Sequence, residues 1–147
     1  MLNLVVLTPC LDVLTGSDGS ISLIRLADKA IVKVPPGLTV PPDAEFSRPV
    51  IIFTAWARPD AGTRETFQQR LRIRAPSGKT VMEKITNPLE IGPDALGHAV
   101  LTTLQGFPAN EQGLYTIDVA VRAGAHSGRW RPANSMRFLV EHVTNED

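Results

Sequence analysis

Cysteine is almost absent from this sequence, which has one, Cys10, among its 147 residues. A single cysteine excludes an intrachain disulfide, so a hydrophobic core has to hold the fold together. A chain of this length is expected to form one domain, spanning residues 1–147, and to bury about two thirds of its unfolded surface. Because Cys10 follows an apolar stretch, we interpret it as a small buried hydrophobic residue and not as a nucleophile.

An excess of charge of either sign is missing as well, since fifteen basic residues balance fifteen acidic ones. A protein that binds nucleic acid by neutralising phosphates needs a basic surplus, so the composition argues against a nucleic-acid partner. Eleven of the basic residues are arginine, and a local basic patch is compatible with the zero balance.

Long hydrophobic runs are absent, and no stretch approaches the roughly 20 apolar residues of a membrane span. The first residues, MLNLVVLTPCLDV, carry no positive charge ahead of their apolar run, and Thr8 and Pro9 interrupt that run. This pattern differs from a secretory signal. We therefore predict a cytoplasmic protein without a membrane partner.

Motifs for catalysis and cofactors are also missing. The histidines His98, His126 and His142 are widely spaced and lie in no metal-ligand pattern. The acidic loop Gly-Ser-Asp-Gly-Ser around Asp18 lacks EF-hand spacing and is typical of a turn. Neither Gly-x-Ser-x-Gly nor a glycine-rich phosphate loop occurs. We expect no enzyme activity, no metal and no cofactor.

What the chain does contain is short runs rich in Val, Ile, Thr and Phe, separated by twelve prolines and eleven glycines. Such runs predict strands, at residues 2–7, 21–26, 30–34, 49–58, 66–75, 80–85, 98–105, 114–123 and 135–143. Only residues 87–99 could hold a short helical turn. We therefore predict an all-β fold, an antiparallel two-layer sandwich of about eight strands with immunoglobulin-like or jelly-roll connectivity.

Three segments resemble a small bacterial β-sandwich family of unknown function: SLIRLADKAI with its proline-rich link, RLRIRAPSGK, and LQGFPANEQGLYTIDVAV. The Gly-x-Tyr entry into a strand in the last segment is common in immunoglobulin-like sandwiches. The likeness extends from about Ile21 to Ala123. It implies the fold and brings no function with it.

The segment RLRIRAPSGK places Arg70, Arg72 and Arg74 on one face of a predicted strand, about 7 Å apart along it. A row of arginines can contact phosphates, but no aromatic residue alternates with these three in the strand. The tight turn Pro-Ser-Gly predicts a hairpin that sets Glu83 across from Arg72. We therefore interpret the row as the solvated face of a sheet.

Trp130 lies between Arg129 and Arg131 in a stretch of small and turn-forming residues. Trp and Arg dominate binding hot spots, so these three residues are a candidate anchor for a protein partner or an anionic ligand. The alternative is that Trp130 folds back to cap the core.

The segment PVIIFTAWARP predicts a strand that is apolar on both faces. Val50, Ile52 and Trp56 share one face, and Ile51, Phe53 and Ala55 share the other. Such a strand has to be covered by its own chain or by a second subunit. We predict a self-association surface at Val50, Ile52 and Trp56.

Two functions are compatible with these patterns. The first is a non-enzymatic sandwich that works through protein association, as a homo-oligomer or with another protein. The alternative is a module that binds a small anionic or carbohydrate molecule at the loop of Arg129, Trp130 and Arg131. An oligomer size that depends on concentration separates the first from the second.

Overall fold

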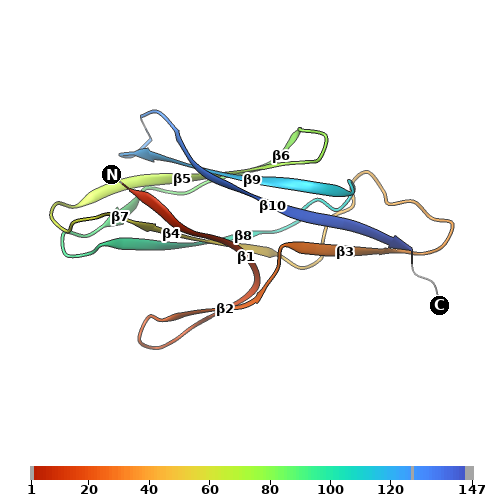
Figure 1. Ribbon diagram of the computed structural model, residues 1–147, viewed down its shortest axis with the longest axis horizontal. Helices are drawn as coiled ribbons and strands as arrows, with labels where there is room; N and C mark the ends of the chain where they lie inside the picture. Colours follow the sequence, from red (N-terminus) through yellow and green to blue (C-terminus); the bar gives the residue numbers. More distant parts are fainter. Residues whose placement is uncertain (1, 127, 145–147) are drawn as a thin grey trace.

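The computed structural model describes residues 2–126 and 128–144, apart from the side chains of residues 24 and 25. Within these residues the chain forms ten strands and no helix, arranged as two packed sheets (Figure 1). The predicted all-β sandwich is confirmed. The helical turn expected within residues 87–99 is wrong, because a short strand, β7 (Leu89–Ile91), pairs with β5 there.

The smaller sheet has the order β2-β1-β4-β8. Its strands are β2 (Ile21–Leu26), β1 (Asn3–Thr15), β4 (Val50–Ala57) and β8 (Gly97–Leu104). β1 is twice as long as predicted and continues through Pro9. Before Cys10 it pairs with β4 alone, and a proline is tolerated in a strand that has one free edge.

The larger sheet has the order β3-β10-β9-β5-β6. Its strands in this order are β3 (Lys29–Val34), β10 (Arg131–Thr144), β9 (Gly113–Ala123), β5 (Glu65–Arg74) and β6 (Thr80–Ile85), and β7 is its sixth strand, paired with β5. All its pairs are antiparallel except β3 with β10, which run parallel from Lys29 beside Leu139 to Val34 beside Thr144.

This strand order is immunoglobulin-like. The chain alternates between the sheets so that β1, β4 and β8 take the places of strands A, B and E, while β5, β9 and β10 take those of C, F and G. The predicted Gly-x-Tyr entry forms the corresponding tyrosine corner: the Tyr115 hydroxyl donates to the Glu111 carbonyl at 3.0 Å and accepts from the Glu111 N–H at 3.3 Å.

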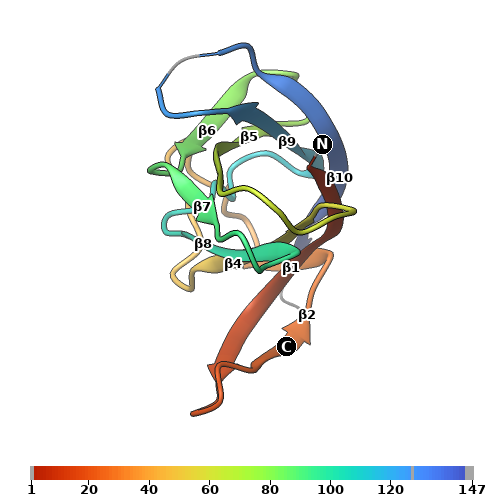
Figure 2. The ribbon, with the colours of Figure 1, turned by 90° about the vertical axis from the view of Figure 1, so that its left-hand side faces the viewer.

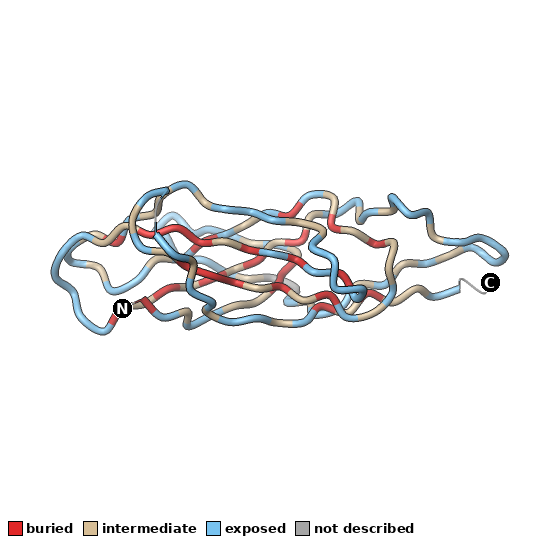
Figure 3. Tube along the Cα trace, turned by 90° about the horizontal axis from the view of Figure 1, so that it is seen from above, coloured by how far each residue is buried: buried red, intermediate tan, exposed pale blue. Residues whose placement is uncertain are grey.

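The core lies between the two sheets, where the period-two alternation of the strands places their apolar side chains. Tyr115, Ile117, Val119 and Val121 of β9 are all buried, as predicted. Trp56 and Phe67 face each other across the sheets with ring centroids 5.9 Å apart. Figure 3 shows buried residues running along the middle of the molecule and exposed turns at its ends.

A polar network lies inside this core. Gln69, which is fully buried, accepts hydrogen bonds at Oε1 from Thr54 Oγ1 at 2.6 Å and from Trp56 Nε1 at 2.7 Å. The indole N–H can only donate, so it fixes the orientation of the amide. The Gln69 Nε2 group then has no hydrogen-bond partner among the described residues.

Arg58, just after β4, is the one cation that is buried among the described residues. Its guanidinium donates to the carbonyls of Thr63 at 2.6 Å, Gly92 at 2.7 Å and Ala95 at 3.1 Å. Glu65 lies 3.6 Å away. One side chain thereby joins the loop that follows β4 to the loop that follows β7.

The tyrosine corner predicts an alkaline weakening of the fold. Burial raises the pKa of Tyr115, with a smaller contribution from the Glu111 carboxylate, against a lowering by the hydrogen bond with the Glu111 backbone. The native state therefore favours the neutral phenol, and its stabilising effect is complete below the ordinary pKa of about 10. This stabilisation is lost as the pH rises above about 10 and passes through the higher pKa that Tyr115 has in the native state.

We expect Tyr115→Phe to lower the free energy of unfolding by about 1–2 kcal/mol at neutral pH, because two hydrogen bonds with the backbone are lost. The variant should also lack the additional loss above about pH 10. Urea unfolding of both proteins below and above that pH measures the difference. Because Tyr115 is the chain's single tyrosine, tyrosinate absorbance reports its titration directly. A parallel decline of both proteins would contradict the assignment.

Candidate functional site

The arginine row lies on the outer face of the larger sheet, as predicted, but its three members have different surroundings. Arg72 pairs with Glu83 of β6 in the predicted cross-strand register, and the ion pair between them is formed. Arg74 donates to both carboxylate oxygens of Asp118 in β9, at 2.7 and 3.3 Å. For these two residues the solvated-face interpretation agrees with the structure.

Arg70 is different, because it has no ion pair and no side-chain hydrogen bond among the described residues. Its guanidinium carbon lies 4.8 Å from the centroid of the Trp130 ring, and that of Arg122 lies 4.4 Å from the same centroid. No aromatic residue alternates with the arginines within β5, as predicted, but one does accompany the row. The aromatic residue comes from the β9–β10 loop and not from the strand itself.

Gln68 explains why Trp130 reaches the arginine row. Its buried side-chain oxygen accepts from Arg122 Nε at 2.8 Å and from the His126 N–H at 2.9 Å, while its Nε2 donates to the Thr86 carbonyl at 2.8 Å. Gly124 N–H also donates to the Thr66 carbonyl at 2.8 Å. These bonds fasten the β9–β10 loop to β5, and Trp130 is the last residue before β10 begins.

The electrostatics of Arg70 follow from this packing. Partial loss of hydration is the largest cause that lowers the pKa of Arg70, followed by the positive charge of Arg72 and, to a smaller extent, that of Arg122. The negative charges of Glu83 and Asp118 raise the pKa and offset this lowering only in part. By contrast, the hydrogen bond and the charge of Asp118 raise the pKa of Arg74. A guanidinium stays charged in proteins, so Arg70 is a cation whose charge Glu83 and Asp118 offset only in part and that forms an ion pair with neither.

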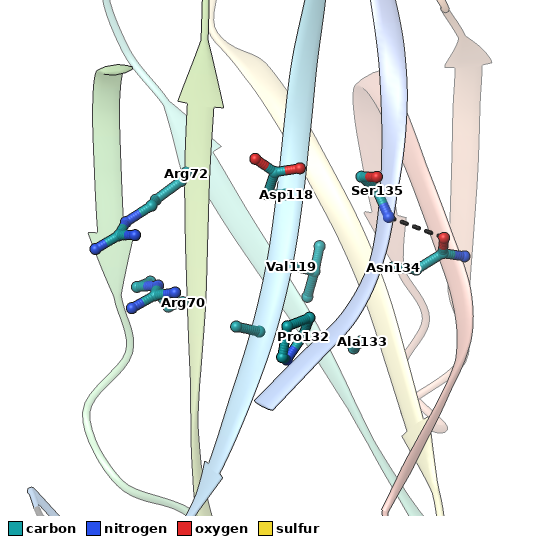
Figure 4. Close-up of a pocket in the computed structure, with 9 residues that line it drawn as sticks. Arg70, Arg72, Asp118, Val119, Pro132, Ala133, Asn134 and Ser135 are labelled. Atoms are coloured by element: carbon teal, nitrogen blue, oxygen red, sulfur yellow. Dashed lines mark hydrogen bonds between the residues drawn. The ribbon is translucent and has the colours of Figure 1, made fainter. Parts of the chain in front are cut away.

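A shallow hollow of about 400 Å³ lies beside Arg70 on the same face. In Figure 4, Arg70 and Arg72 stand on β5 at one side with their guanidinium groups toward β6, and Asn134 and Ser135 stand on β10 at the other side. Ala120 and Pro132 also line the hollow. Asp118 lines it as well, so the hollow combines two cations, a carboxylate, neutral polar groups and a small apolar surface. Its volume is within the range of small-molecule sites.

The predicted neighbours of Trp130 lie elsewhere. Arg131 donates to the Leu2 carbonyl at 2.8 Å, and Arg129 and Arg131 line a second hollow of about 360 Å³ together with Leu2 and Glu65. The arginines that contact the indole are Arg70 and Arg122 instead. Alternation along β9 places Arg122 on the outer face, but no sequence signal shows that β5 lies next to it.

The predicted self-association residues are in the core. Val50, Ile52 and Trp56 are 4%, 0% and 1% exposed, because this face of β4 is the inward one and the larger sheet covers it. Ile52 and Trp56 therefore cannot contact a second subunit in the folded protein, and Val50 reaches the surface only where it lines a groove. The opposite face, with Ile51, Phe53 and Ala55, is half-buried.

Other candidate groups are separated from one another. The ring of His98 contacts the Glu90 carbonyl at 3.0 Å and that of His142 the Ala109 carbonyl at 2.7 Å. Across the described ranges, no three His, Cys, Asp or Glu side chains gather closely enough to hold a metal ion.

Cys10 is buried, and burial raises the pKa of its thiol, with a further contribution from Asp12. No helix in the part of the chain that the structure describes could cross a membrane.

Comparisons with known proteins add little to this geometry. No family model matches the chain. No curated protein matches it either. Among solved structures, the C-terminal domain of Wzt resembles it with a TM-score of 0.49 and 9% identity, over 73% of this chain and 66% of that one. This chain thus spans just under two thirds of that domain, and a likeness at this level supports no inference about function.

Proposed function

We propose that the protein is a non-enzymatic module that binds a small anionic molecule on the outer face of the larger sheet. Arg70 is the anchor of this site, and Arg122 and Trp130 support it. The observation that carries the proposal is that Arg70 is half-buried against Trp130 and has no anionic partner among the described residues, while Arg72 and Arg74 on the same strand each have one.

The stacked arrangement suits recognition of an anion. Packing against the indole restricts the guanidinium before a ligand arrives, so less side-chain entropy is lost on binding. The five N–H donors of Arg70 are free of side-chain hydrogen bonds within the described residues. A carboxylate or phosphate could accept two of them in parallel, which is the strongest geometry for such a contact.

The hollow beside Arg70 supports a ligand with hydroxyl groups as well as charge. Asn134 and Ser135 lie across it from the arginines, and Ser135 N–H already donates to Asn134 Oδ1 at 2.8 Å. We infer binding and not catalysis, because Asp118, the one carboxylate among the residues that line the hollow, is already engaged in an ion pair with Arg74. Membership of the bacterial sandwich family that the sequence resembles remains a further proposal, since no family model matches.

The test compares Arg70→Gln with Arg64→Gln, which removes the same charge from an exposed arginine that does not line the hollow. Inorganic phosphate and glucuronate are titrated at constant ionic strength, and amide and indole N–H chemical shifts are followed by NMR. We expect saturable shifts around Trp130 in the wild type. Loss of a charged hydrogen-bonding partner costs about 1.5–3 kcal/mol, so Arg70→Gln should bind about 10–100-fold more weakly.

Arg64→Gln should keep an affinity close to that of the wild type, since Arg64 pairs with Glu90 and belongs neither to the hollow nor to the stack on Trp130. Equal weakening in both variants would show a non-specific charge effect and overturn the site. Absence of any saturable response of the wild type to either anion would overturn the proposed function.

A further inference from the structure

The end of β1 and the whole of β2 form an arm that leaves the sandwich. β1 pairs with β4 only as far as Cys10, so residues 11–15 pair with β2 alone. β2 in turn packs against no strand other than β1 among the described elements. Figures 1 and 2 both show this two-stranded arm, residues 11–26, projecting away from the two packed sheets.

One face of the arm carries mostly apolar residues. The cross-strand pairs Val13–Leu23 and Thr15–Ile21 share this face with Leu11. The other face includes Leu14 and Leu26, which are 60% and 63% exposed. An isolated two-stranded ribbon is marginally stable in water, and an arm with apolar residues on both faces gains stability only when another surface covers it.

An apolar groove opens at the base of the arm. Its volume is about 340 Å³. The apolar residues that line it come from four strands and from the segment before β4: Leu11, Ala30, Ile31, Phe46, Val50 and Phe138. Leu11 belongs to both surfaces, so the apolar face of the arm continues directly into the groove.

We propose that the groove receives the arm of a second copy of this chain, and that two copies exchange arms reciprocally. Each copy has both surfaces, so one two-fold axis can satisfy both at once, and exchange of a projecting element is a low-cost route to a dimer. The chain's own arm projects away from the two packed sheets. The proposed exchange is independent of the anion site on the outer face of the larger sheet.

The charges at the two surfaces are complementary. Asp18 at the tip of the arm is ionised and exposed, and the hydrogen bonds it accepts from Ser20 lower its pKa. Arg48 lines the groove and has no ion pair among the described residues. The second cation of the groove, Lys29, pairs with Glu141 at 3.1 Å. Arg48 therefore favours an acidic arm tip over a basic or neutral partner surface.

Light scattering behind a sizing column, across a hundredfold range of concentration, tests the dimer. We expect the wild type to approach twice its monomer mass at high concentration. Ile21→Glu, on the arm, and Ile31→Glu, in the groove, should each remain folded monomers across that range. Leu96→Glu serves as the matched control, because Leu96 is 53% exposed against 52% for Ile31 and lies beyond the opposite end of β4.

Hydrogen exchange decides where the contact lies. Amides of residues 11–26 should become protected as the wild type dimerises and should stay unprotected in the Ile31→Glu variant, whose own arm is unchanged. A monomeric wild type at every concentration would overturn the proposal. A dimer that survives both substitutions, or one whose arm amides exchange freely, would overturn it too. Because Ile21→Glu and Ile31→Glu lie on two separate surfaces, the remaining variant still tests the proposal if the other one misfolds.

Discussion

Trp56→Glu is expected to abolish folding. Trp56 is 1% exposed, packs against Phe67 and donates to Gln69. Truncating a buried tryptophan costs about 3–5 kcal/mol, and an unpaired buried carboxylate adds several kcal/mol more. If the Gln69 amide turns round, its Nε2 group can donate a hydrogen bond to the introduced carboxylate, but one such bond offsets only part of the free-energy cost of burying that charge. The sum approaches or exceeds the roughly 5–15 kcal/mol by which domains are stable.

Circular dichroism and a sizing column measure this outcome. The control is Ala55→Glu, which places the same charge one residue away on the outer, half-buried face of β4. That variant should keep its sheet signal and lose about 1 kcal/mol, as is usual for a single substitution. A folded Trp56→Glu protein would show that β4 does not face the core in the way described.

Arg58→Met is expected to lower the free energy of unfolding by about 3–5 kcal/mol, the usual cost of removing one partner from a buried charged network. The methionine fills much of the same space but leaves the carbonyls of Thr63, Gly92 and Ala95 without their donor. Both loops that Arg58 joins should also exchange their amides faster, since local opening follows the loss of local contacts.

Urea unfolding gives the free energy, with Arg64→Met as the control. Arg64 lies in the same loop and pairs with Glu90 at 3.2 Å, but both side chains are more than half exposed. An exposed ion pair contributes about 0–1 kcal/mol. If the two variants lose the same stability, the three carbonyl bonds of Arg58 are not what holds these loops.

The sequence predicts those features of the structure that depend on residues close together in the chain, and not those that depend on contacts between distant segments. Alternation along β9 and β5 predicts their buried faces, and the Pro-Ser-Gly turn predicts the pairing of Arg72 with Glu83, because both depend on residues close in the chain. In β4 the alternation is uninformative, since both faces are apolar. Its one polar residue, Thr54, even points inward, because Gln69 from another strand supplies its hydrogen-bond partner.

The candidate site is less predictable for the same reason. Arg70 and Trp130 are both identified in the sequence as notable, but nothing local indicates that they touch. Their contact requires β5 to lie beside β9 and the β9–β10 loop to bend back through Gln68. The sequence therefore identifies Arg70 and Trp130 separately, but the arginines that lie over the indole are Arg70 and Arg122, and not the neighbours in sequence Arg129 and Arg131.

The parallel pairing of β3 with β10 has a consequence for how the chain folds. It joins β3 to β10, two strands that lie far apart in the sequence, so the larger sheet cannot complete that edge until β10 has left the ribosome. Pairings between distant segments slow folding, because the entropy of closing the loop is lost before the contacts form. During synthesis, the edge of β9 that β10 later covers stays open to other strands, and chaperone protection matters most in that interval.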